Sequence, residues 1–195
     1  FVILMAIGEW FSYKLADKVI SILPNTYEHV EKFGVKKHNF EVVENGYNPK
    51  VRSTTFKTLN SRNITIGYVG SIGVSNALET LIEAAKKLED IKFKVAGDGV
   101  LRKQMEELAE GAKNIDFLGA IPKNEVQKFI SSTDVLYLGT IDTDLYKYGV
   151  SMNKIFDYME GGKPIIFGCN TTNDPISKSK CGYVIKPESV DELVK

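Results

Sequence analysis

The stretch from Ile64 to Ala96, ITIGYVGSIGVSNALETLIEAAKKLEDIKFKVA, determines the fold class. Apolar runs at its two ends, residues 64–69 and 93–96, predict strands. Between them apolar residues recur at the spacing of one helix face: Ala77, Leu78, Leu81, Ile82, Ala85 and Leu88. A strand, a helix and a second strand in this order form a right-handed βαβ unit with parallel strands.

The same pattern continues toward the C-terminus. Short apolar runs predict strands at 115–118, 135–138, 165–167 and 183–185, and helical spacing predicts helices near 101–112, 126–130 and 155–159. The strands lack polar alternation, as expected where helices cover both faces of a parallel sheet. We therefore predict an α/β fold with a doubly wound, Rossmann-like parallel sheet. In its common strand order, 3-2-1-4-5-6, ligands bind beyond the ends of the first and fourth strands.

Residues 1–48 are interpreted as the end of a preceding α/β domain. A helix ends near Ala16, and strands at 19–23 and 40–43 flank a helix at 26–33 that Gly34 stops. The polar residues 49–62 predict a linker, and residues 63–195 form the doubly wound domain. The apolar start lacks the basic flank of a signal peptide, so we expect an interior piece of a longer chain, clipped at its C-terminus too.

Composition excludes several classes of protein. Lys plus Arg and Asp plus Glu are balanced at 25 each, so no nucleic-acid partner is expected. No apolar run approaches the roughly 20 residues of a membrane span. The two cysteines, Cys169 and Cys181, and the two histidines, His29 and His38, lack the spacing of metal ligands. These residues therefore predict no metal site.

The loop after the first strand of the doubly wound domain carries Gly70, Ser71 and Gly73. Glycines allow a tight turn close to a ligand, and Ser75 is predicted to cap a helix whose N-terminus attracts anions. Gly97 and Asp98 follow the next strand and face the same edge of the sheet, where Asp98 could also cap a helix. The loop lacks the G-x-G-x-x-G fingerprint, so an ordinary strand-to-helix turn remains an alternative.

The loop after the fourth strand leads into Gly149, Val150, Ser151 and the helix that contains Lys154. Ser151 is predicted to cap this helix, and a diphosphate near its start would meet backbone N–H groups and the Lys154 ammonium. The carboxylate of Asp157, one turn on, could accept hydrogen bonds from two adjacent ribose hydroxyls. The alternative is a surface ion pair between Lys154 and Asp157. Asp142 to Asp144 resembles a metal-binding D-x-D motif but is interpreted as a polar turn.

The segment YGVSMNKIFDYMEGGKPII, residues 148–166, resembles the donor-site motif of family-4 retaining glycosyltransferases of the GT-B fold. It is most similar to the branch that acts in capsule, O-antigen and exopolysaccharide synthesis. Residues 70–73, 95–99 and 114–119 fit the same family, and the Asn45-Gly46 turn matches the end of its N-terminal domain.

The resemblance implies a transfer that needs no metal or other cofactor and that moves a sugar from a nucleotide sugar with retention of anomeric configuration. The donor that it implies is a UDP-sugar of a hexose or N-acetylhexosamine. It implies that Lys154 lies near the diphosphate, that Asp157 binds the ribose, and that backbone at Gly119 to Ile121 meets the base. The remaining expected donor contacts are Gly70, Ser71, Gly73, Gly97, Asp98, Gly149, Val150, Ser151 and Asn153. The implied partner is a glycan or lipid-linked acceptor. The resemblance places the acceptor site and any catalytic base on a preceding domain, so we expect this piece alone to bind the donor only. That domain would also allow peripheral association with the inner face of the membrane from the cytoplasm.

Three departures keep other functions open. Gly149 stands where the family's E-x7-E motif has its first acidic residue, and Ser71 and Asn76 stand where many members carry Arg and Lys. The first departure permits a non-catalytic sugar-nucleotide-binding protein of a polysaccharide assembly complex. A GT-B sugar-nucleotide epimerase would need an acid–base set that the residues do not offer. An NAD-binding oxidoreductase is disfavoured because the first loop lacks the glycine fingerprint.

Overall fold

The computed structural model describes residues 1–47 and 64–195, which form two compact units. The first unit combines residues 1–47 with two later segments, 144–151 and 171–174. The second contains the rest of the described chain from residue 64 onward. The predicted linker at 49–62 lies outside the described residues.

The first unit has a two-stranded parallel sheet of β1 (Val19–Ser21) and β2 (Phe40–Val42), in which Val19 pairs with Phe40. Helix α1 (Val2–Leu15) precedes the sheet, and α2 (Tyr27–Val30) with the 3-10 turn η1 (Glu31–Phe33) connects its strands. A second turn, η2 (Lys37–Asn39), leads into β2. Gly34 ends η1 in the left-handed region, as predicted from its position.

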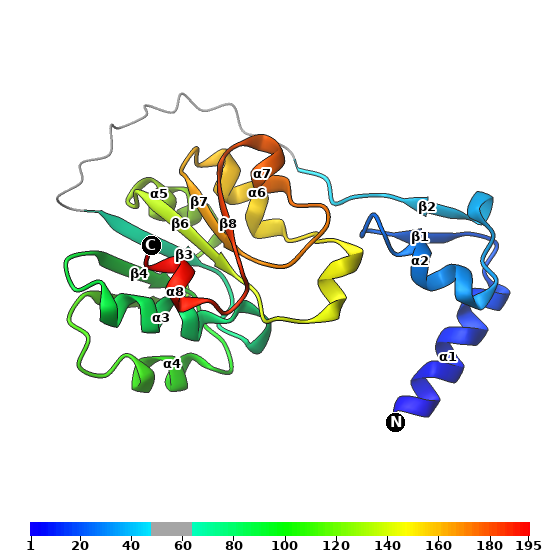
Figure 1. The fold of residues 1–195 in the computed structure, drawn as a ribbon, viewed down its shortest axis with the longest axis horizontal. Coiled ribbons are helices and arrows are strands. Elements are labelled where there is room, and N and C mark those ends of the chain that lie inside the picture. Colours follow the sequence, from blue (N-terminus) through cyan, green and yellow to red (C-terminus); the bar gives the residue numbers. More distant parts are fainter. Residues whose placement is uncertain (48–63) are drawn as a thin grey trace. The chain divides into compact units, whose positions relative to one another are not determined.

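The second unit is built on a six-stranded parallel sheet in the order β5-β4-β3-β6-β7-β8 (Figure 1). Its strands are β3 (Thr65–Val69), β4 (Lys92–Ala96), β5 (Ile115–Gly119), β6 (Val135–Gly139), β7 (Ile165–Gly168) and β8 (Gly182–Ile185). Counted from β3 this is the predicted order 3-2-1-4-5-6, so the doubly wound fold is confirmed. The order reverses between β3 and β6, which pair through Ile66 and Val135.

Helices cover both faces of this sheet (Figure 1). One layer holds α3 (Leu78–Lys87), α4 (Arg102–Leu108) and α8 (Val190–Leu193), and the other holds α5 (Val126–Ser131), α6 (Asn153–Glu160) and α7 (Pro175–Ser179). The 3-10 turns η3 (Val74–Asn76), η4 (Lys123–Glu125) and η5 (Asp144–Tyr148) lie in the connections. Within the described ranges, no helix is both long and apolar enough to cross a membrane.

The main core lies between the sheet and the α3 layer. The apolar stripe of α3 packs on side chains of β3 and β4, and Leu78, Leu81, Ile82, Phe93 and Val95 are each about 1% exposed. Full burial of such a side chain stabilises the fold by about 1.5–3 kcal/mol. The core therefore fixes α3 against β3 and β4, and this packing holds the end of β3 in place.

The predicted strands are all present, and two differences concern helices. Helix α4 ends at Leu108, three residues before Gly111, so the predicted helix to 112 is too long. Helix α7 is absent from the prediction because it has five residues, of which only Ile176 is buried. Such a short helix has no room for an apolar stripe, so periodicity cannot indicate it.

Candidate functional site

The candidate site lies at the carboxyl ends of β3 and β6, where the strand order of the second unit reverses. The loops that leave these two strands begin at Gly70 and Thr140. In open parallel sheets this is the position at which ligands bind, because connections to neighbouring strands run in opposite directions there. The structure therefore confirms that the two loops singled out from the sequence leave adjacent strands.

The loops after β3 and β4 are joined by backbone hydrogen bonds. The Gly70 N–H donates to the Ala96 carbonyl at 3.0 Å, and the Ile72 N–H donates to the Asp98 carbonyl at 2.8 Å. Gly97 adopts φ +146°, and a Cβ there would overlap the Gly70 carbonyl oxygen. Gly97 is thus required for the close approach of two loops, a structural role that the sequence did not reveal.

Other predicted contacts in these loops have different surroundings. A Cβ at Gly73 would meet no atom within 4 Å, so its backbone borders open space. The Ser71 side chain is exposed, while its carbonyl accepts hydrogen bonds from the Tyr68 hydroxyl at 2.6 Å and from Asn76 Nδ2 at 3.1 Å. The Asp98 carboxylate accepts from the Gly99 N–H at 2.8 Å. These bonds hold the glycine loop in a single shape at the end of β3.

Lys154 belongs to the first turn of α6 and extends over the end of β3. Its Nζ donates to the Tyr68 hydroxyl at 3.3 Å and to Asn76 Oδ1. It also lies 5.0 Å from the centre of the Tyr68 ring, and a Cβ at Gly70 would be 3.1 Å from it. The structure therefore brings Lys154 to the glycine loop, as the predicted diphosphate site requires.

The partners of Lys154 leave its charge uncompensated. Both are neutral groups, and no ion pair found in the described ranges, 1–47 and 64–195, joins Lys154 to a carboxylate. Burial lowers the pKa of Lys154 from 10.5 to about 8, because removal from water disfavours the ammonium form. A partly buried cation whose partners are all neutral can bind an anionic ligand strongly.

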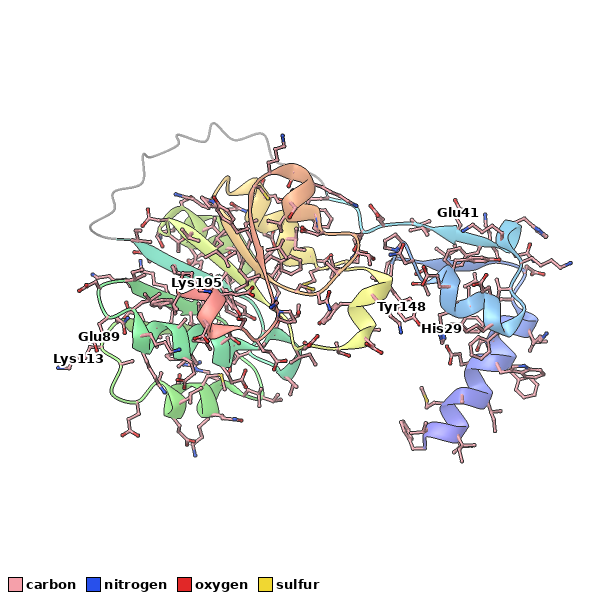
Figure 2. All side chains as sticks on the ribbon, viewed as in Figure 1. His29, Glu41, Glu89, Lys113, Tyr148 and Lys195 are labelled. Carbon is pink, nitrogen blue, oxygen red and sulfur yellow. The ribbon has the colours of Figure 1, made fainter. Side chains whose placement is uncertain are left out.

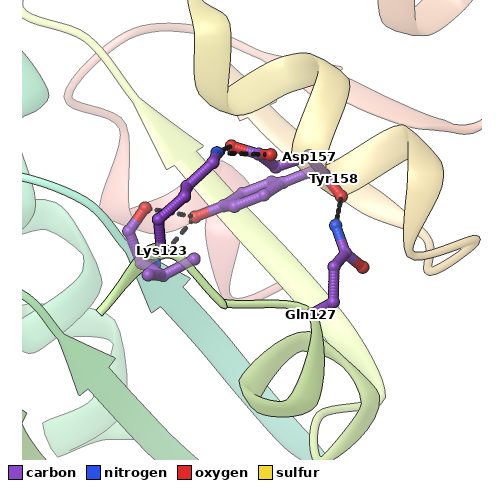
Figure 3. A network of polar contacts seen from close by, with 5 residues as sticks. Lys123, Gln127, Asp157 and Tyr158 are labelled. Carbon is purple, nitrogen blue, oxygen red and sulfur yellow. Dashed lines mark hydrogen bonds and ion pairs between the residues drawn. The ribbon is translucent and has the colours of Figure 1, made fainter. Parts of the chain in front are cut away.

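Asp157 has a different partner from the one considered in the sequence. Both of its carboxylate oxygens lie 2.6 Å from Lys123 Nζ, and its backbone carbonyl accepts from Gln127 Nε2 at 2.9 Å (Figure 3). Lys154 instead bonds to Asn76. The alternative of a surface pair between Lys154 and Asp157 is therefore wrong. The two side chains contact different loops.

Tyr158 fixes the position of α6 against the sheet. Its fully buried hydroxyl accepts from the Val69 N–H at 2.9 Å and faces the Val69 carbonyl at 3.3 Å. Burial raises the pKa of Tyr158, so the phenol stays neutral. Because Tyr158 is four residues after Lys154, one helix face carries both contacts with β3. The hydrogen bond between Tyr158 and Val69 thus fixes the position of Lys154 relative to the glycine loop.

The segment from Gly119 to Lys123 connects β5 with α5. The Gly119 carbonyl accepts from the Gly97 N–H at 2.7 Å, which ties this segment to the loop after β4. Ile121 is partly buried, and Lys123 begins η4 two residues later. The connection that contains residues 119–121, whose backbone is predicted to meet a base, therefore also supplies the cation that holds Asp157.

Gly149, Val150 and Ser151 belong to the first unit, where they contact residues distant in sequence. The Val150 N–H donates to Asn173 Oδ1 at 2.8 Å, and the Ser151 carbonyl accepts from Asn45 Nδ2 at 3.3 Å. Gly149 has φ +114°, and a Cβ there would lie 2.6 Å from the Pro24 ring. A side chain at position 149 is therefore incompatible with this arrangement.

The residue before Gly149 is also held within the first unit. The Tyr148 carbonyl accepts from the Asn25 N–H at 3.0 Å. Its ring lies edge-on to His29, with centroids 5.9 Å apart, and both residues are labelled in Figure 2. His29 in turn bonds Glu9 at 2.7 Å, and this hydrogen bond lowers the pKa of Glu9. His29 therefore links Glu9 of α1 to Tyr148 within the first unit.

Three predicted helix caps are wrong. The N-cap of α3 is Ala77, at φ +41°, because η3 occupies the place where Ser75 was expected to start the helix. The N-cap of α6 is Met152, not Ser151, and that of α4 is Leu101, not Asp98. None of these three helices has a side-chain cap bond, so their starts are set by tertiary packing. The exposed Asn153 is the first residue of α6.

The D-x-D segment lies at the start of η5. The Asp142 N–H donates to the Glu188 carboxylate at 2.7 Å, and Asp144 lies 3.7 Å from Lys147. In the part of the chain that the structure describes, no three His, Cys, Asp or Glu residues gather as metal ligands would. The polar turn inferred from the sequence agrees with these contacts.

Sequence reasoning missed Lys123, Tyr68 and the bond between Asn76 and Lys154. Tyr68 reads as one more apolar strand residue, and Lys123 follows a proline in a polar stretch. Asn76 carried a useful signal, because it stands where the resemblance leads one to expect a lysine and its loop contacts Lys154. Its amide meets the Lys154 ammonium, so the cation is supplied from α6 while the loop supplies an acceptor.

The chain is similar to known proteins in sequence and in fold. The curated 2-deoxystreptamine glucosyltransferase of Streptomyces kanamyceticus is 28% identical over 138 residues, which are 67% of this chain and 34% of that protein. HepE of Anabaena, solved in complex with UDP and glucose, superposes with a TM-score of 0.70 at 16% identity. TarM of S. aureus, solved as a mutant in complex with fondaparinux, alpha-GlcNAc-glycerol and UDP, superposes with a TM-score of 0.74 at 17% identity.

The two structural comparisons cover 97% and 96% of this chain and 55% and 38% of the other chains. At these identities they show the fold alone. This chain thus spans about a third of the curated relative and about half of HepE. The profile of the family described as glycosyl transferases group 1 matches residues 63–195, the part that contains the candidate site.

Proposed function

The chain belongs to the glycosyl transferases group 1 family, and from this premise we propose that its protein transfers a sugar from a nucleotide-sugar donor to a glycan or lipid-linked acceptor. We propose a UDP-sugar of a hexose or N-acetylhexosamine as donor, retention of anomeric configuration, and a role in cell-surface polysaccharide synthesis. The UDP complexes of HepE and TarM, together with the sequence resemblance, support the donor.

The position and contacts of Lys154 are the main support for this proposal. Its ammonium lies beside the glycine loop, contacts neutral groups and is partly withdrawn from water. In the transfer, the bond from the sugar's C1 to the diphosphate oxygen breaks and the acceptor oxygen bonds to C1, while the acceptor proton passes to a base. Negative charge therefore grows on the diphosphate, and a preorganised cation there stabilises the transition state.

We propose that the transfer needs no metal ion. Lys154, the N–H groups at the start of α6 and the positive end of that helix's dipole would then neutralise the leaving diphosphate. Asp157 would accept hydrogen bonds from the ribose hydroxyls, and backbone of residues 119–121 would face the base.

Gly149 favours one competing function, that of a non-catalytic sugar-nucleotide-binding protein. Position 149 has no acidic side chain, and its φ of +114° and the nearby Pro24 ring exclude one. A non-catalytic protein would bind UDP and release none from a UDP-sugar. An enzyme releases UDP when donor and acceptor are both supplied.

The experiment combines binding and turnover. Calorimetric titration with UDP, GDP and ADP identifies the base, and UDP release with an acceptor extract measures transfer by the protein. We expect Lys154→Ala to lower transfer by about 100-fold or more, the size typical of losing one oxyanion-stabilising group. The exposed Lys128 on α5 provides the control, and Lys128→Ala should transfer normally. Unchanged transfer by Lys154→Ala removes this lysine from the mechanism.

A further inference from the structure

Lys123 joins the connection after β5 to helix α6 through an ion pair with Asp157. It begins η4, and its Nζ lies 2.6 Å from both Oδ1 and Oδ2 of Asp157 (Figure 3). The neighbouring Gln127 donates to the Asp157 backbone carbonyl at 2.9 Å. Two residues from one segment thus hold the side chain and the backbone of the same aspartate.

The two members of the ion pair differ in exposure. The Asp157 side chain is 14% exposed, whereas that of Lys123 is 76% exposed. A carboxylate that is largely shielded from water depends on its protein partner for orientation, because little water is available to replace that partner. In a surface pair with both members exposed, water can replace the lysine, so the lysine does little to orient the carboxylate.

The bidentate geometry leaves the carboxylate able to bind a second ligand. Each oxygen of an ionised carboxylate has two acceptor positions, and Lys123 occupies one on each oxygen. The outer position on either oxygen remains free and can accept from one ribose hydroxyl. Lys123 therefore fixes the carboxylate plane and leaves an acceptor position available to the ribose.

We infer that Lys123 is a positioning residue for the donor nucleotide, which orients Asp157 so that it accepts a hydrogen bond from a ribose hydroxyl. The inference rests on the proposed function, because it takes the ribose role of Asp157 as given. Lys123 lies two residues after Ile121, so the segment proposed to meet the base also sets the ribose contact. Recognition of base and ribose is thereby coupled through one short stretch of chain.

The test uses two nucleotides that differ only in the diol. The affinities of UDP and of 2′,3′-dideoxy-UDP are measured calorimetrically for the wild-type protein and for Lys123→Met. We expect wild type to prefer UDP, and Lys123→Met to bind UDP about fivefold more weakly with unchanged affinity for the dideoxy compound. Lys123→Arg should retain the preference, since a guanidinium also binds a carboxylate through two hydrogen bonds.

Lys128→Met is the matched control, because it removes an exposed lysine from the adjacent helix and should bind both nucleotides as wild type does. In the Asp157→Asn background, Lys123→Met should have no further effect. Equal weakening of both nucleotides by Lys123→Met would mean direct contact with the diphosphate and would overturn the inference. A retained preference in Lys123→Met also overturns it, while leaving the proposed function intact. A wild-type protein that binds no UDP refutes both.

Discussion

Replacement of Lys154 by methionine should stabilise the fold while it removes diphosphate binding. Burial lowers the pKa of Lys154 from 10.5 to about 8. A difference of one pKa unit between folded and unfolded states is about 1.4 kcal/mol, so the buried charge costs the fold roughly 3 kcal/mol at pH 7. Methionine has a similar length and carries no charge, so this cost disappears in the variant.

The lost hydrogen bonds reduce the gain. Without Lys154, the buried Asn76 side chain loses the donor to its Oδ1, and the Tyr68 hydroxyl loses one donor. An unsatisfied buried acceptor costs about 1–2 kcal/mol. We therefore expect Lys154→Met to be more stable than wild type by about 1–2 kcal/mol at pH 7.

The gain should depend on pH in a defined direction. Between pH 8 and 10.5 the unfolded chain keeps the Lys154 proton and the folded chain has lost it, so wild-type stability rises with pH. At pH 9.5 the cost of the charge falls to roughly 1 kcal/mol, and the advantage of Lys154→Met should vanish.

Urea unfolding of wild type, Lys154→Met and the exposed-lysine control Lys128→Met at pH 7 and pH 9.5 measures the difference. The control should match wild type within about 0.5 kcal/mol at both values. If Lys154→Met is destabilised by the same amount at both values, Lys154 acts as a structural hydrogen-bond donor and the account of its buried charge is incorrect.

Three further results follow from the same geometry. The dissociation constant for UDP should rise about tenfold between pH 7 and pH 9 in calorimetry as Lys154 loses its proton, and a constant value would show that the charge is not used. Asp157→Asn should bind UDP more weakly by about tenfold and 2′,3′-dideoxy-UDP as wild type does, whereas equal affinities for UDP would reject the ribose contact. Gly97→Ala should lower the free energy of unfolding by more than about 2 kcal/mol, because its Cβ would overlap the Gly70 carbonyl, and Gly73→Ala, whose Cβ meets open space, should be nearly neutral in the same unfolding assay.

The sheet and its strand order were predictable because both depend on patterns that extend over many residues. Short apolar runs between helical stripes indicate a parallel sheet, and right-handed crossovers restrict its topology. The helix starts were less predictable, since α3, α4 and α6 begin without side-chain caps. Ser75 and Ser151 have the composition of caps, but packing of the whole helix sets the first residue.

The location of the site in the fold was predictable, but only some of its side-chain contacts were. The switch point and the motif lysine located Lys154 beside the glycine loop. The pairing of Asp157 with Lys123 joins residues 34 apart in sequence, and no local pattern signals such a contact. The use of Gly97 for loop approach was equally hidden, because it depends on backbone atoms of another loop.

A crystal structure of the protein with bound UDP tests the central claim most directly. The account predicts a diphosphate oxygen about 2.7–2.9 Å from Lys154 Nζ at the start of α6. A diphosphate bound elsewhere, with Lys154 still directed only at Asn76 and Tyr68, would contradict it.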